Sequence, residues 1–154
     1  MNNIKKTNTN RSQSGFTLME LLIVIVIIGM LVALVAPRFT SRIGEAAVKT
    51  TKAQVELLAS ALETYHMDVG NFPTSDQGLS ALLDKPYEVD GEDWRGPYLK
   101  KLNLPRDAWK NEFIYLGPDD QEVTAKRLDY IISSLGKDGT SGGSEEDADI
   151  MSYE

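Results

Sequence analysis

The sequence predicts an α+β fold, in which one long N-terminal helix packs against a small antiparallel β-sheet. Three features predict it. Apolar residues and a single Gly fill an unbroken run over residues 21–36. Apolar or small residues then continue at helical spacing as far as Tyr65. Two later segments, residues 112–116 and 128–135, are rich in the β-branched and aromatic residues that are typical of strands.

The net charge of −7 is unevenly distributed along the chain. Residues 1–15 carry three basic residues and no acid, whereas the segment from Lys137 onward contains one Lys and six acids. An acidic surface of this kind argues against nucleic-acid binding, which needs a basic face. The chain has no Cys, which excludes a disulfide framework and a thiolate metal site.

Residues 16–36 have the length of a membrane span. As an α-helix they would extend about 31 Å, close to the ~30 Å thickness of a bilayer core. The basic residues before them place the N-terminus in the cytoplasm. Because the small residue Gly15 precedes the apolar run, cleavage after it would remove only the leader, unlike the cleavage of a secretory signal peptide. Hydropathy alone is equally consistent with an uncleaved signal anchor.

Glu20 lies one turn inside this segment, where a lone carboxylate costs about 3 kcal/mol unless it is paired. No Lys or Arg lies between Phe16 and Pro37. The α-amine that cleavage would free at Phe16, on the same chain or on a neighbour, is a candidate partner. A charge that needs a partner chain can set the register of an assembly. The alternative is a carboxylate that reaches the lipid headgroups.

The sequence GFTLMELL at residues 15–22 resembles the processing site of type IV pilins and pseudopilins. The resemblance implies that a prepilin peptidase cuts after Gly15 and methylates Phe16. It implies that Glu20 pairs with the N-terminus of a neighbouring subunit. It also implies a type IV pilin-like fold with a leader over residues 1–15, a transmembrane and assembly half of the helix over 16–36, and a periplasmic domain over 37–154.

The remaining elements are predicted from local signals. We expect the long helix to run from Phe16 to about Met67 and to be kinked or loosened at Pro37. A capping box at residues 74–77 predicts a short helix over residues 75–83. A third strand is expected around residues 122–125. We expect the aromatic residues of the globular part to pack in the core; they are Trp94, Tyr98 and Trp109.

Four further fragments resemble one branch of the family, the major pseudopilin of type II secretion systems. They lie at residues 70–74, 77–79, 94–99 and 134–139. The resemblance implies a structural subunit that polymerises into a periplasmic pseudopilus and drives folded proteins through the outer membrane. Its implied partners are copies of itself, minor pseudopilins, the prepilin peptidase and an inner-membrane assembly platform. The 107–113 loop lacks the prolines and the glycine that are usual in the family, so we expect it to be less rigid.

The acidic segment over residues 138–149 is the candidate metal site. Oxygen ligands on a Gly-rich loop suit Ca²⁺ rather than Zn²⁺, although composition alone favours a solvated, disordered tail. The resemblance implies that this loop binds Ca²⁺. The implied ligands are the side chains of Asp138, Glu145, Asp147 and Asp149 and the backbone carbonyls of Leu135 and Ile150.

Three other functions fit the sequence less well. A type IV pilin of a surface fibre often carries a C-terminal disulfide, for which this chain has no Cys. A signal-anchored periplasmic binding module would stay monomeric and keep its leader. An enzyme is not expected, because the single His, His66, has no recognisable nucleophile partner and acyl- or phosphoryl-transfer motifs are absent.

Overall fold

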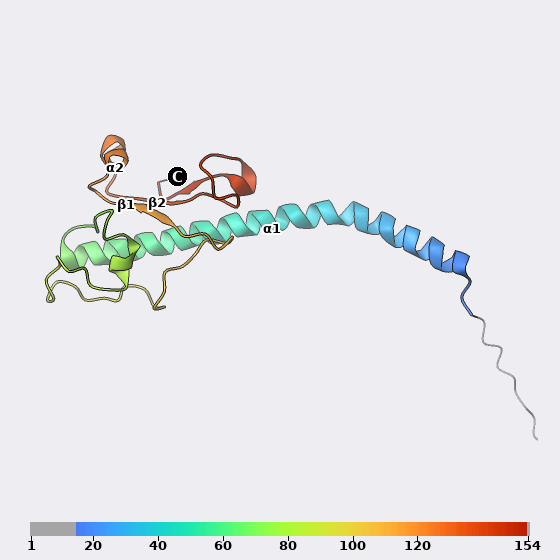
Figure 1. The fold of residues 1–154 in the computed structure, drawn as a ribbon, viewed down its shortest axis with the longest axis horizontal. Coiled ribbons are helices and arrows are strands. Elements are labelled where there is room, and N and C mark those ends of the chain that lie inside the picture. Colours follow the sequence, from blue (N-terminus) through green and yellow to red (C-terminus); the bar gives the residue numbers. More distant parts are fainter. Residues whose placement is uncertain (1–14, 154) are drawn as a thin grey trace, which may run out of the picture. The chain divides into compact units, whose positions relative to one another are not determined.

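The computed structural model describes residues 15–153, and of residues 35–41 it describes the backbone alone. The elements, in chain order, are α1 (Leu18–Val69), the 3₁₀ helix η1 (Leu79–Leu82), β1 (Ile114–Leu116), α2 (Gln121–Lys126), β2 (Ile131–Ser134), the 3₁₀ helix η2 (Glu145–Asp147) and β3 (Ile150–Met151) (Figure 1). The chain divides into two compact units, with the boundary between Thr40 and Ser41.

In the N-terminal unit, residues 18–40 form the first part of α1. The predicted long helix is confirmed, and it begins at Leu18, two residues later than expected. From Leu18 to Leu34 the large apolar side chains are between 43% and 82% exposed in the single chain. Among the described residues, no helix combines the length and the apolar character needed to cross a membrane. The kink expected at Pro37 falls where only the backbone is described, and it stays a prediction.

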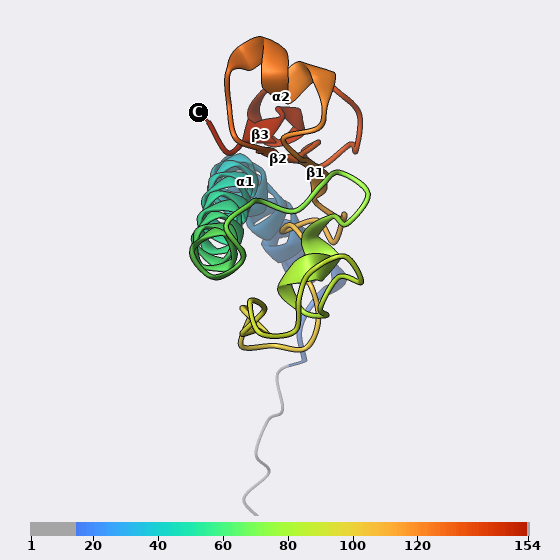
Figure 2. The same ribbon diagram turned by 90° about the vertical axis from the view of Figure 1, so that its left-hand side faces the viewer.

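The C-terminal unit has one core, built on the second part of α1. Val55, Leu58, Leu62 and Tyr65 are buried at spacings of three and four residues, as the apolar stripe predicts. The sheet lies on one side of this helix together with α2, and η1 lies on another (Figure 2). Two separate surfaces of the helix are therefore covered within this unit.

The sheet is antiparallel, with strand order β1-β2-β3. Tyr115 of β1 lies opposite Ile132 of β2, and Ser134 of β2 lies opposite Ile150 of β3. Every residue of β2 is buried. The strands predicted over residues 112–116 and 128–135 are confirmed, in shorter form, as β1 and β2.

The third strand predicted around residues 122–125 is wrong, because these residues form α2. The carboxylate of Asp120 accepts a hydrogen bond from the Glu122 amide at 2.7 Å and so caps the start of the helix. The left-handed Arg127 ends it, and Val123 is fully buried beneath it. The third strand is instead β3, near the C-terminus.

The helix predicted over residues 75–83 is also wrong, although its capping box forms. The Thr74 amide donates to Gln77 Oε1 at 3.0 Å, and the Gln77 amide donates to Thr74 Oγ1 at 3.2 Å. Gly78 then adopts a left-handed φ of 59°. An α-helix cannot propagate through that conformation, so only η1 follows. The predicted core aromatics do pack against the core; they are Trp94, Tyr98 and Trp109.

Candidate functional site

The start of α1 places the predicted processing and assembly residues next to each other. Gly15 and Phe16 are exposed just before the helix. The Glu20 amide donates to Thr17 Oγ1 at 3.2 Å, so Thr17 caps the first turn. Sequence reasoning missed this residue, although Thr-x-x-Glu at residues 17–20 is a capping signature. The carboxylate of Glu20 is exposed and makes no ion pair among the described residues.

The acidic loop, residues 135–149, is closed at its base. Leu135 directly follows β2, and Ile150 begins β3, so the two predicted carbonyl ligands stand at neighbouring strand ends. The Lys137 amide donates to the Glu146 carbonyl at 2.9 Å, and Lys137 Nζ lies 3.0 Å from Glu146 Oε2. The tail is therefore a folded loop, rather than the disordered tail that its composition favours.

The carboxylates within the loop have different partners. Asp138 accepts hydrogen bonds from the Thr140 hydroxyl at 2.8 Å and from the Thr140 amide at 3.1 Å, and these hold the pKa of Asp138 below its usual value. Asp149 Oδ2 accepts from the Gly142 amide at 3.0 Å. Asp149 Oδ1 is buried and has no hydrogen-bond partner among the described residues. Glu145 is in the left-handed region, with φ of 56°.

The chemistry of this donor set fits Ca²⁺. The donors are hard oxygens on one loop, and the orphaned Asp149 Oδ1 is a buried acceptor of the kind that a cation would satisfy. Across residues 15–153, however, no three carboxylate or imidazole side chains are gathered closely enough to hold a metal ion. The predicted ligands Asp138, Glu145, Asp147 and Asp149 thus share a loop without converging on one point.

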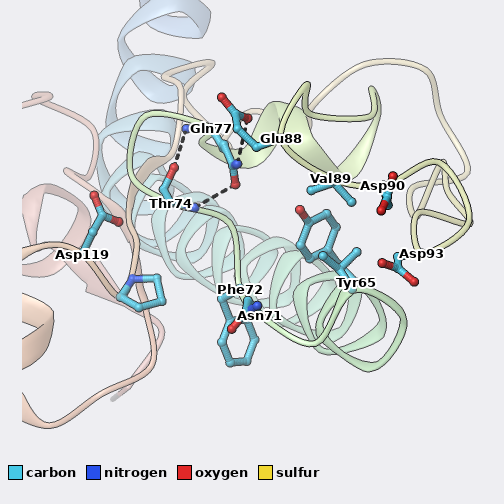
Figure 3. A pocket seen from close by; sticks show the side chains of 12 residues that line it. Tyr65, Asn71, Phe72, Thr74, Gln77, Glu88, Val89, Asp90, Asp93 and Asp119 are labelled. Atoms are coloured by element: carbon cyan, nitrogen blue, oxygen red, sulfur yellow. Dashed lines mark hydrogen bonds between the residues drawn. The ribbon is translucent and has the colours of Figure 1, made fainter.

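A separate acid-lined cleft of about 580 Å³ lies at the C-terminal end of α1. Tyr65 and Phe72 contribute aromatic surface, and Gln77 donates to Glu88 Oε2 at 3.2 Å (Figure 3). His66 stacks on Phe72 with ring centroids 4.4 Å apart. Its Nδ1 is buried without a hydrogen-bond partner in the described part of the chain. The ring therefore packs against Phe72.

Comparison with known families decides what kind of protein carries these features. Residues 38–153 match the family described as type II secretion system (T2SS), protein G. The chain belongs to this family. Residues 10–36 match the prokaryotic N-terminal methylation motif, which spans Gly15, Phe16 and Glu20.

Individual members of the protein G family are similar over nearly the whole chain. The type II secretion system core protein G of Pseudomonas aeruginosa is 41% identical, covering 94% of this chain and 97% of the relative. That of Vibrio cholerae is 38% identical, with 93% of each chain covered. The crystal structure of the major pseudopilin from the type 2 secretion system of enterohaemorrhagic Escherichia coli matches with a TM-score of 0.52 and 28% identity, covering 70% of this chain and 86% of that one. The predicted assignment to the major pseudopilins of type II secretion is confirmed.

Proposed function

We propose that the chain is cut after Gly15, methylated on Phe16 and held in the inner membrane by residues 16–36, with residues 37–154 in the periplasm. The observation that carries this proposal is the match of residues 10–36 to the N-terminal methylation motif. The exposed apolar side chains of α1 between Leu18 and Leu34 support it, since such a surface needs hydrocarbon or other apolar chains around it.

Copies of the processed chain then assemble through this half of the helix into a periplasmic pseudopilus. The Glu20 carboxylate pairs with the methylated α-amine of a neighbouring Phe16, which sets the axial register. The growing filament moves folded exoproteins toward an outer-membrane channel, together with minor pseudopilins and an inner-membrane assembly platform. The subunit acts through assembly and not through catalysis.

Mass analysis of the mature N-terminus tests the processing step directly. The chain extracted from membranes of the secreting cell should begin at Phe16 and carry one additional methyl group. Protein from a strain without prepilin peptidase, as the control, should keep residues 1–15. A mature chain that begins at Met1, or after a cut beyond Ala36, would refute this part of the proposal and would favour a signal-anchored monomer.

We also propose that the acidic loop binds Ca²⁺ with side chains drawn from Asp138, Glu145, Asp147 and Asp149 and with the carbonyls of Leu135 and Ile150. Two features support this. The loop is closed at its base by the contacts of Lys137 with Glu146, and Asp149 Oδ1 lacks a hydrogen-bond partner within the part of the chain that the structure describes. When bound, Ca²⁺ supplies positive charge that offsets the repulsion among the acids, and it stabilises only the folded loop.

Removal of Ca²⁺ should therefore lower the thermal stability of the protein. A ligand at one hundred times its Kd stabilises by about 2.7 kcal/mol, which corresponds to a melting temperature higher by roughly 10 °C. We expect this difference between Ca²⁺ and chelator for the full chain in detergent micelles, with Mg²⁺ a weak substitute. Differential scanning calorimetry measures it.

Two variants test whether the effect arises in the loop. Asp138→Ala should abolish the difference between Ca²⁺ and chelator. Asp76→Ala removes an exposed carboxylate outside the loop and should leave the difference intact. Equal melting temperatures of the parent chain in Ca²⁺ and in chelator would refute the metal proposal.

A further inference from the structure

The Asp107 carboxylate is buried, with a residue exposure of 5%, and it forms no ion pair among the described residues. Among the described residues, hydrogen bonds alone satisfy its two oxygens. Oδ1 accepts from the Asn111 amide at 2.7 Å and from the Trp109 amide at 3.0 Å, and Oδ2 accepts from Ser134 Oγ at 2.7 Å. Burying a carboxylate without a cation beside it costs free energy. The hydrogen-bond network around Asp107 offsets that cost.

The network leads from Asp107 to the first residues of the acidic loop. Asn111 Nδ2 donates to the Gly136 carbonyl at 2.9 Å. The Gly136 amide donates to Ser134 Oγ at 3.3 Å, the same hydroxyl that donates to Asp107. Both backbone polar groups of Gly136 are thus held, immediately after Leu135 and two residues before Asp138.

The held residue lies directly against the other end of the loop. A Cβ atom placed on Gly136 would lie 2.7 Å from the carbonyl carbon of Asp147, so the two backbones are in close contact. The next residue, Lys137, donates its amide to the Glu146 carbonyl. Contacts that hold Gly136 in place therefore also hold Glu146 and Asp147 on the other side of the loop base.

The 107–111 loop is itself fixed to the core helix. The Ala108 amide donates to Thr51 Oγ1 at 3.1 Å, and Thr51 is fully buried in α1. Because the usual prolines and glycine are missing, the sequence predicts a less rigid loop. In the structure, hydrogen bonds to α1, to β2 and to Gly136 restrain the loop in their place.

We propose that Asp107 and Asn111 are positioning residues for the Ca²⁺ loop, and that they raise its affinity for the ion by holding Gly136 in place without contacting the ion. This inference rests on the proposed Ca²⁺ binding. Ordering a flexible loop costs conformational entropy, and a base that is already fixed reduces the part of that cost that falls on binding. Partners that orient metal ligands typically change metal affinity by about 10–100-fold.

The test is Ca²⁺ titration of the full chain in detergent micelles by isothermal calorimetry, with Asn111→Ala as the variant. This change removes the donor to Gly136 and leaves the Asn111 amide bonded to Asp107. We expect a Kd for Ca²⁺ about tenfold higher, with a melting temperature in chelator close to that of the parent. Raising Ca²⁺ about tenfold should restore the parent's melting temperature, which would not happen if Asn111 only stabilised the fold.

Two further variants make the result decisive. Asn111→Leu keeps the size of the side chain without the donor and should weaken Ca²⁺ binding equally. Asn103→Ala makes the same substitution as Asn111→Ala at an exposed position nearby and should leave Kd unchanged. Equal Kd values for the parent and both Asn111 variants would overturn this inference alone. A parent chain that binds no Ca²⁺ would overturn the metal proposal and this inference with it.

Discussion

Replacing Glu20 with Ala should leave membrane insertion and leader cleavage intact and reduce assembled pseudopilus at least tenfold. The carboxylate lies in the first turn of α1 and makes no ion pair among the described residues. A hydrogen bond to a charged group contributes about 1.5–3 kcal/mol, and its loss recurs at every subunit contact of the fibre. Quantifying cross-linked oligomers in sheared fractions, beside the cleaved monomer in membranes, measures the effect.

Two matched changes separate the charge from the packing of this segment. Glu20→Gln keeps the size and loses the charge, and it should fail to assemble in the same way. Met19→Ala shortens an exposed neighbouring side chain, which is 72% exposed in the single chain, and should assemble much more than Glu20→Ala. If Glu20→Ala forms as much fibre as the parent, Glu20 does not set the register.

Gly136→Ala should lower the free energy of unfolding by roughly 3 kcal/mol and the melting temperature by roughly 10 °C. Two costs add. The φ of Gly136 is 67°, a left-handed conformation that costs a non-glycine residue about 1–2 kcal/mol. The new Cβ would also meet the backbone of Asp147, which must move and so open the base of the acidic loop. Calorimetry without Ca²⁺ measures the loss of stability, and calorimetry with Ca²⁺ measures how far that loss depends on the ion.

Gly139 provides the matched control within the same loop. Its φ is also 67°, but a Cβ there would have no neighbour within 4 Å among residues 15–153. Gly139→Ala therefore carries only the conformational cost, about 1–2 kcal/mol. The difference between the two variants isolates the close approach of Gly136 to Asp147. Equal losses of stability would show that this approach contributes nothing.

Much of the N-terminal half was predictable from the sequence because the information there is local. The long helix follows from apolar spacing that repeats over many turns, and α1 ends at Val69, two residues beyond the expected end. The residues Gly15, Phe16 and Glu20 stand at fixed distances along the chain, so the motif can be recognised without a fold. The capping box of Thr74 and Gln77 formed for the same reason.

Predictions failed where a local signal was weak or a single residue overrode it. Residues 122–125 have strand-like character, but Asp120 caps a helix there and buries Val123. The left-handed Gly78 stopped the predicted helix after one turn. β3 had no signal of its own, because Ile150 and Met151 are two residues whose extended conformation depends on pairing with β2.

Local sequence patterns were enough to predict the long helix, the processing motif, the sheet's first two strands and the collection of acids in one loop. How that loop is held depends on contacts that form only in the folded chain. Asp107 accepts a hydrogen bond from Ser134, 27 residues away, and Asn111 donates one to Gly136, 25 residues away. Nothing in the spacing of these residues predicts the contacts, because they exist only after α1, the 107–111 loop and β2 have packed together and excluded water from the groups between them.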